Sequence, residues 1–244
     1  MLLTALGIDS KDLDRKRLMD LEQNLEIVRT WIHDPDVFTS RKSVCEAASL
    51  MHKLVTRPSP LTQYRGMTFK DLAVADNILS GKIVSKYECE SWTPRKGIAE
   101  SFAPMDDLSR GISYLMKRKF SKQEVILDVD GLTQSLRIFA KEFKAAMKKD
   151  EWHPTLDLIG EKIFSRIVKY MLDLNESDEE EFLMHPRPYN SKDIVRMKID
   201  KKYMVDKRTP NLLKLLNSHE WYLPDELIGK WLFMKAGQIE KVVE

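Results

Sequence analysis

The chain has 244 residues, of which 43% are hydrophobic and 32% charged, and its formal net charge is +2 with a pI near 8.3. This composition is typical of a globular protein and excludes an intrinsically disordered chain. The small net charge does not match the strongly basic balance of a dedicated nucleic-acid-binding domain.

Cysteine and histidine usage and the N-terminal segment narrow the class further. Cys45 and Cys89 are the only cysteines, which excludes a disulfide framework and a cysteine-rich zinc site, and the five histidines have no metal-ligand spacing. We therefore expect no metal site. No apolar run approaches the roughly 18 residues of a membrane helix, and the N-terminus lacks a signal-peptide pattern, so we expect a cytoplasmic protein.

The first 57 residues have the pattern of a helical N-terminal lobe. Ser10 is a candidate N-cap, and a second helix is predicted over residues 43–54. The prolines at 58 and 60 indicate a short linker. One helix is predicted from apolar residues that recur at helical spacing: Leu18, Leu21, Leu25, Val28 and Ile32.

From residue 61 onward short strands alternate with helices. We predict a strand over residues 61–67, a helix over 71–79 that ends at Ser80-Gly81, and extended chain over 83–93. Residues 125–129 are apolar on both parities, which is typical of a buried central strand.

The second half of this region completes an α+β fold. Two apolar periodicities predict a helical insertion near residues 131–173. The run 182–184 is apolar, and apolar and charged residues alternate over 195–200, as in a half-buried strand. The predicted domains are therefore the lobe 1–57 and a core 61–244.

Three short motifs follow one another along this core. Tyr64-Arg65-Gly66 lies at the end of the first predicted strand, and Ser91-Trp92-Thr93 lies on the next, with Phe102 eleven positions after Ser91. The acidic run Glu179-Glu180-Glu181 leads directly into the apolar segment 182–184. Each motif alone is common on protein surfaces, so their order and placement carry the inference.

This order resembles the Arg–Ser–Glu class of mono-ADP-ribosyltransferases, which includes T-even-phage and binary-toxin enzymes. The resemblance covers roughly residues 61–200 and implies an ADP-ribosyltransferase-like mixed β-sheet core. It departs from the compact toxins in the long interval between Ser91 and Glu181, which contains the predicted helical insertion. A phage enzyme or intracellular effector fits the absence of a signal peptide.

The resemblance also implies residue roles. Arg65 would clamp the diphosphate of NAD⁺, because a guanidinium donates two parallel hydrogen bonds to phosphate. The backbone at Gly66 would pair with the nicotinamide carboxamide, and the Phe102 ring would stack on nicotinamide. Ser91 would orient the catalytic carboxylate, and Thr93 would support the same strand edge.

Glu181 takes the place of the catalytic glutamate, whose charge stabilises an oxocarbenium-like ribose as nicotinamide leaves. In the family, a glutamate two residues earlier, here Glu179, accompanies transfer to arginine side chains. We therefore predict an NAD⁺-dependent enzyme that modifies a protein arginine, with NAD⁺ as co-substrate and no metal.

Other functions stay open at this stage. In one alternative, ADP-ribose is transferred to nucleic acid, whose bases would stack on aromatic residues that lie between basic ones. In another, the chain is an NAD⁺ glycohydrolase and water is the acceptor. A binding module with a degenerate site is less consistent with an intact Arg65, Ser91 and Glu181. Two basic segments and their aromatic neighbours support the nucleic-acid hypothesis: Arg110, Lys117, Arg118, Lys119, Lys122, Lys198, Lys201, Lys202, Lys207 and Arg208, with Tyr114, Phe120 and Tyr203.

Overall fold

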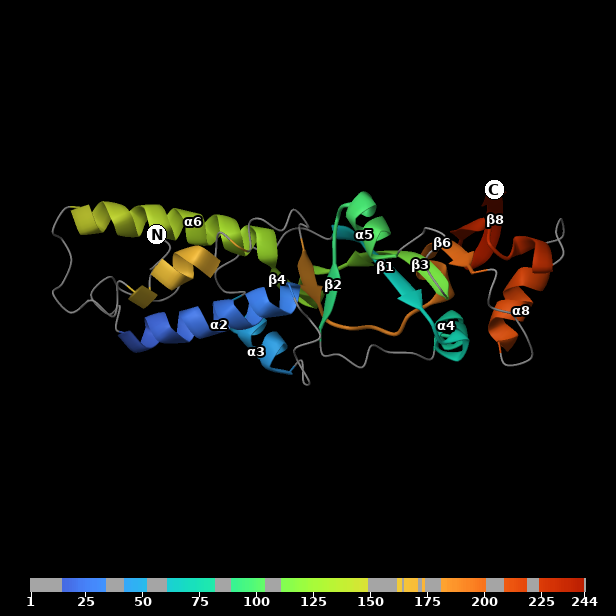
Figure 1. The fold of residues 1–244 in the computed structure, drawn as a ribbon, viewed down its shortest axis with the longest axis horizontal. Helices are drawn as coiled ribbons and strands as arrows, with labels where there is room; N and C mark the ends of the chain where they lie inside the picture. The colour runs from blue at the N-terminus through green and yellow to red at the C-terminus, as the bar shows by residue number, and fades with distance from the viewer. Residues whose placement is uncertain are drawn as a thin grey trace. The chain divides into compact units, whose positions relative to one another are not determined.

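The computed structural model contains helices and antiparallel sheets, which confirms the α+β class (Figure 1). It describes residues 15–33, 42–51, 61–81, 89–103, 111–148, 162–163, 165–170, 173, 181–200, 209–218 and 224–243. The described chain divides into two compact units. The first unit comprises residues 1–59, 87–90 and 122–185, and the second comprises 60–86, 91–121 and 186–244.

The first unit contains a helical core against part of a small sheet. Its helices are α2 (Arg15–His33), α3 (Lys42–Met51) and α6 (Val129–Lys148), and residues 165–170 are also helical. A 3₁₀ turn, η4 (Lys122–Glu124), leads into strand β4 (Val125–Asp128), and strand β5 (Phe182–Met184) pairs with it antiparallel.

One continuous hydrophobic cluster holds this unit together. The predicted stripe of α2 packs inward through Leu25 and Val28, which are fully buried. The cluster joins α2 and α3 to β4, to the start of α6 and to the helical residues near 163–167. The N-terminal helices therefore share a core with the segment that was predicted to be a helical insertion. Ser10 lies outside the described residues.

The three-stranded sheet has the order β2-β5-β4, where β2 is Glu90–Trp92. The chain passes from the first unit to the second within β2. β4 is buried as predicted, but the prediction that it is central is wrong, since β5 has that position. Residues of β4 at both odd and even positions pack in the same cluster as the helices. The apolar pattern of β4 therefore indicated that the strand is buried, but not that it has a strand on each side.

The second unit contains a five-stranded sheet in the order β1-β3-β6-β7-β8. Every pairing in it is antiparallel, whereas the family resemblance implies a mixed sheet. Strand β6 is half-buried, as its alternation predicts. The strands are β1 (Leu61–Phe69), β3 (Ile112–Phe120), β6 (Ile194–Ile199), β7 (Trp231–Lys235) and β8 (Gln238–Val243).

Short helices cover both faces of this sheet (Figure 1). They are α4 (Leu72–Leu79), α5 (Lys96–Phe102) and α8 (Pro210–Asn217), with 3₁₀ turns η5 (Ser191–Asp193) and η6 (Pro224–Leu227). Tyr114 of β3 donates to the Ala75 carbonyl of α4 at 3.2 Å. Because Tyr114 is opposite Met67, α4 covers the face of odd-numbered β1 residues, and α5 covers the face of Gly66.

Buried Asp76 joins α4 to α8. Its Oδ1 accepts from the backbone N–H of Leu212 at 2.7 Å, and its Oδ2 accepts from the Asn211 amide at 2.7 Å. These bonds satisfy donors in the first turn of α8, which has Pro210 at its start. The predicted helix at 71–79 is confirmed, with Asp71 as its N-cap and Gly81 at φ +71° after it.

No helix among the described residues combines the length and the apolar character needed to cross a bilayer.

Candidate active site

Arg65 lies at the centre of β1 and not at its end, because the strand continues to Phe69. Its Nη1 donates to the backbone oxygen of Ser91 at 2.7 Å. The side chain is half-buried, and its Nε has no hydrogen-bond partner among the described residues. Arg65 thus links the first motif to the second.

A backbone bridge fixes these two motifs relative to each other. Tyr64 N–H donates to the Thr93 oxygen at 2.7 Å, and Thr93 N–H donates to the Tyr64 oxygen at 3.0 Å. The pair is an isolated antiparallel bridge. The Thr93 hydroxyl accepts from the Arg95 N–H at 3.1 Å, at the start of α5. Thr93 therefore shapes the turn into α5, and its side chain is buried.

Gly66 is required by the close approach of α5. A Cβ at this position would lie 1.8 Å from the Ala99 oxygen and 2.7 Å from the Ala103 nitrogen. The peptide groups of a strand alternate in direction, and Tyr64 directs its own toward Thr93. Gly66 therefore directs its N–H and C=O to the same edge, where the described residues provide no backbone pair beyond Tyr64–Thr93.

Phe102 ends α5 and is 53% exposed. It is not a core aromatic, although its neighbour Ala103 is fully buried beside Gly66. An exposed aromatic ring is a surface on which a flat aromatic ligand can stack.

Trp92 is held by contacts that were not predicted from the sequence. Its ring packs edge-on against Phe120 at 4.9 Å, and the Arg118 guanidinium lies 5.2 Å from it. Arg118 pairs with Asp193 at 2.6 Å and donates to the Pro188 oxygen at 3.0 Å. These contacts fix β2, and with it Ser91 and Thr93, within the second unit.

Glu181 belongs to the first unit, while Arg65, Gly66, Ser91, Thr93 and Phe102 belong to the second. Glu181 directly precedes β5 and is 6% exposed. Its backbone oxygen accepts from the Val129 N–H at 3.0 Å, which fixes the segment where β4 enters α6. Glu179 and Glu180 lie outside the described residues.

The first basic segment does not present the aromatic surface expected for base stacking. Tyr114 and Phe120 are buried, at 0% and 2% exposure, and Arg118 is buried in its ion pair. Lys117 and Lys119 alternate with Arg118 and are exposed. Arg110 and residues 201–208 lie outside the described residues. Stacking on Tyr114 and Phe120 is therefore ruled out by their burial.

Among the described residues, no group of three or more His, Cys, Asp or Glu side chains is arranged to hold a metal ion. Comparison with known proteins finds no relative: no protein-family model, no curated protein and no solved structure matches this chain.

Proposed function

We propose that this chain is a mono-ADP-ribosyltransferase, which cleaves NAD⁺ between nicotinamide and ribose and transfers ADP-ribose to a macromolecule. The observation that carries the proposal is the Arg65–Ser91 hydrogen bond beside the Tyr64–Thr93 bridge. It joins two of the three motifs, on β1 and β2, and the third motif directly precedes β5. The proposal includes an ADP-ribosyltransferase-like core with a helical insertion.

Arg65 suits the diphosphate of NAD⁺. One of its N–H groups is used by the Ser91 carbonyl, which orients the guanidinium, and its Nε has no partner among the described residues. The fixed guanidinium plane favours bidentate contact with phosphate oxygens, which a lysine ammonium cannot make.

The edge of β1 beyond the bridge suits the nicotinamide. Gly66 offers one N–H donor and one C=O acceptor there, which together match a carboxamide. Phe102 is exposed on the helix that packs against Gly66 and supplies the stacking ring. This arrangement holds the leaving group by its polar substituent and its ring face.

In this proposal Glu181 acts in the cleavage of NAD⁺, and Glu179 acts in the transfer to the acceptor. As the ribose C1′–nitrogen bond breaks, nicotinamide leaves with the bonding electrons, and the Glu181 carboxylate stabilises the cationic ribose. An arginine nitrogen of the acceptor protein then attacks C1′ and gives its proton to Glu179. By the family resemblance, Ser91 would orient the catalytic carboxylate.

Two alternatives use the same scaffold: transfer to nucleic acid, and hydrolysis of NAD⁺ by water. All three reactions release nicotinamide, so this release tests the proposal as a whole. The purified chain is incubated with NAD⁺ and free nicotinamide is measured. If no nicotinamide appears with cell lysate present as a source of acceptor, the proposal is wrong.

The acceptor is then identified with labelled NAD⁺ and lysate. For a protein arginine, protease removes the labelled product, nuclease does not, and neutral hydroxylamine releases it slowly. Label lost to nuclease would indicate a nucleic-acid acceptor, and free ADP-ribose alone would indicate a glycohydrolase. Glu179→Gln should stop transfer to protein and spare slow hydrolysis, since water needs no carboxylate to orient a guanidinium.

A further inference from the structure

One face of the five-stranded sheet combines cations with aromatic rings outside the proposed active site. The residues that form it face the same side because their cross-strand register places them opposite one another. This cationic aromatic face consists of Arg196, Lys198, Trp231, Phe233 and Lys241. It is the side of the sheet that α5 covers farther along, over Gly66.

The rings and cations are in direct contact. The Arg196 guanidinium lies 4.5 Å from the Trp231 ring centre and 5.0 Å from that of Phe233. Lys198 Nζ lies 5.4 Å from the Trp231 ring centre, and Lys241 is opposite Phe233 on the neighbouring strand. Both rings are partly exposed, whereas the alternate residues of β7 are buried in the sheet's other face.

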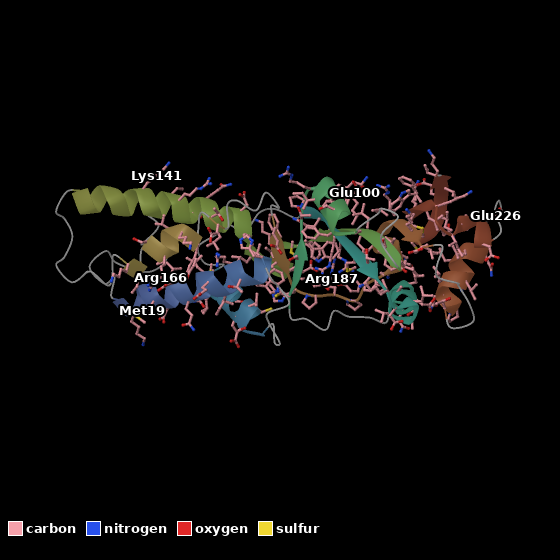
Figure 2. The ribbon with its side chains drawn as sticks, in the orientation of Figure 1. Met19, Glu100, Lys141, Arg166, Arg187 and Glu226 are labelled. Atoms are coloured by element: carbon pink, nitrogen blue, oxygen red, sulfur yellow. The ribbon has the colours of Figure 1, made fainter. Side chains whose placement is uncertain are left out.

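The cationic aromatic face has more cationic than acidic side chains. Glu100 of α5, labelled in Figure 2, pairs with Arg196 at 2.6 Å and with Lys96 at 3.4 Å. These three groups together carry one positive charge. Lys198 and Lys241 are further cationic side chains of this face, which attract a polyanion.

We propose that the cationic aromatic face binds single-stranded nucleic acid. Trp231 and Phe233 are two residues apart on one strand, so their rings are spaced for successive unpaired bases to stack on them or on the Arg196 guanidinium plane. The lysines on both sides of the rings reach the phosphates. Polyglutamate has carboxylates for the cations but no rings to stack, and a duplex keeps its bases paired.

Binding to this face does not depend on the proposed transfer reaction and is measured without NAD⁺. The full chain is titrated into a fluorescein-labelled 12-nucleotide oligo(dT) at low salt, and anisotropy is followed as salt is raised. We expect tighter binding of this strand than of a 12-base-pair duplex or a polyglutamate peptide. Equal binding of polyglutamate would overturn the proposal in favour of an acidic protein partner.

Two kinds of variant locate the surface. Lys198→Gln with Lys241→Gln should weaken binding and reduce the slope of log affinity against log salt by roughly 0.7 for each phosphate that the variant no longer neutralises. The matched control, Lys162→Gln with Lys169→Gln, removes the same charge from exposed positions of the first unit and should leave the slope unchanged.

Trp231→Leu removes a stacking ring and should weaken binding about fivefold or more. Phe233→Leu is the second ring variant if Trp231→Leu does not fold, as judged by its circular dichroism. If the lysine pair on the face and the control pair have the same effect, or if no oligonucleotide binds at low salt, this face is not a nucleic-acid surface.

Discussion

Glu181 is the residue on which the proposed chemistry depends most directly. Glu181→Gln keeps the shape of the side chain and removes its charge. Turnover of NAD⁺ should fall by about 10²–10³, the scale expected when a preorganised charge-stabilising group is removed. Nicotinamide release measures turnover, and calorimetric titration should show much less change in NAD⁺ affinity. Glu26→Gln, an exposed position on α2, serves as the control, and turnover near wild type in Glu181→Gln would remove Glu181 from the mechanism.

Arg65 is predicted to act in binding. Arg65→Lys keeps the positive charge but loses the planar fork that donates to Ser91 and, as proposed, to phosphate. We expect weaker NAD⁺ binding with an unchanged far-ultraviolet circular dichroism spectrum. A titration that gives the wild-type affinity would show that the diphosphate is held elsewhere.

Asp128 offers a pH-dependent test of the first unit. Burial raises the pKa of its carboxyl, an effect that outweighs the backbone N–H groups of Gly131 and Asp130 that lower it. The stability that this raised pKa contributes is present below the unfolded pKa of about 3.9 and is lost as pH rises through the folded pKa.

Asp128→Asn keeps an oxygen to accept from Gly131 N–H, a bond of 2.9 Å, and cannot ionise. Urea unfolding from pH 3.5 to 7 should therefore show the wild type losing stability relative to Asp128→Asn as pH rises. Parallel stability curves for the two proteins would contradict this expectation.

At the scale of elements, the packing of α5 on β1 makes a sharp contrast between two glycines. Gly66→Ala places a Cβ against the α5 backbone, so α5 must shift, and we expect a loss of about 1–3 kcal/mol or more in the free energy of unfolding. The matched control is Gly97→Ala in α5 itself, because a Cβ at Gly97 would meet nothing within 4 Å.

Gly97→Ala should be neutral or stabilising by up to about 1 kcal/mol, because alanine loses less conformational entropy in a helix. Chemical denaturation of both variants measures the change in the free energy of unfolding. Similar stability of the two would mean that α5 does not approach β1 as closely as the structure describes.

The local hydrophobic pattern of the sequence predicted several strands and helices well, but it did not predict which strands pair with each other. The alternation over residues 195–200 predicted β6, and the mostly apolar residues at 125–129 predicted a buried strand, because burial leaves a direct signature in the residue types. Which strand neighbours β4 is set by tertiary pairing, so its edge position was not predictable from the run itself.

The same limit applies to the candidate site. Arg65, Gly66 and Ser91 were found from short motifs, and the structure brings these three residues together within the second unit. Arg118 was assigned to a basic surface segment, because nothing local distinguishes it from Lys117 and Lys119. Its partner Asp193 and the rings around it come from distant parts of the chain.

At the scale of the whole molecule, the chain crosses between the two units five times. A fragment that begins at residue 61 therefore loses α2 and α3 from the core that covers β4. We expect the 61–244 fragment to lack a cooperative thermal transition for the first unit and to regain it when a 1–57 peptide is added. A fragment that melts like the full chain would contradict this division of the core.

The shared core of the N-terminal helices and β4 also bears on how the protein is made. During synthesis α2 and α3 leave the ribosome well before residues 125–129, which complete their hydrophobic cluster. At about 5–20 residues per second, the interval is on the order of ten seconds. The apolar face that includes Leu25, Val28 and Trp31 stays uncovered by those residues on the nascent chain for that time, which makes it a target for chaperones.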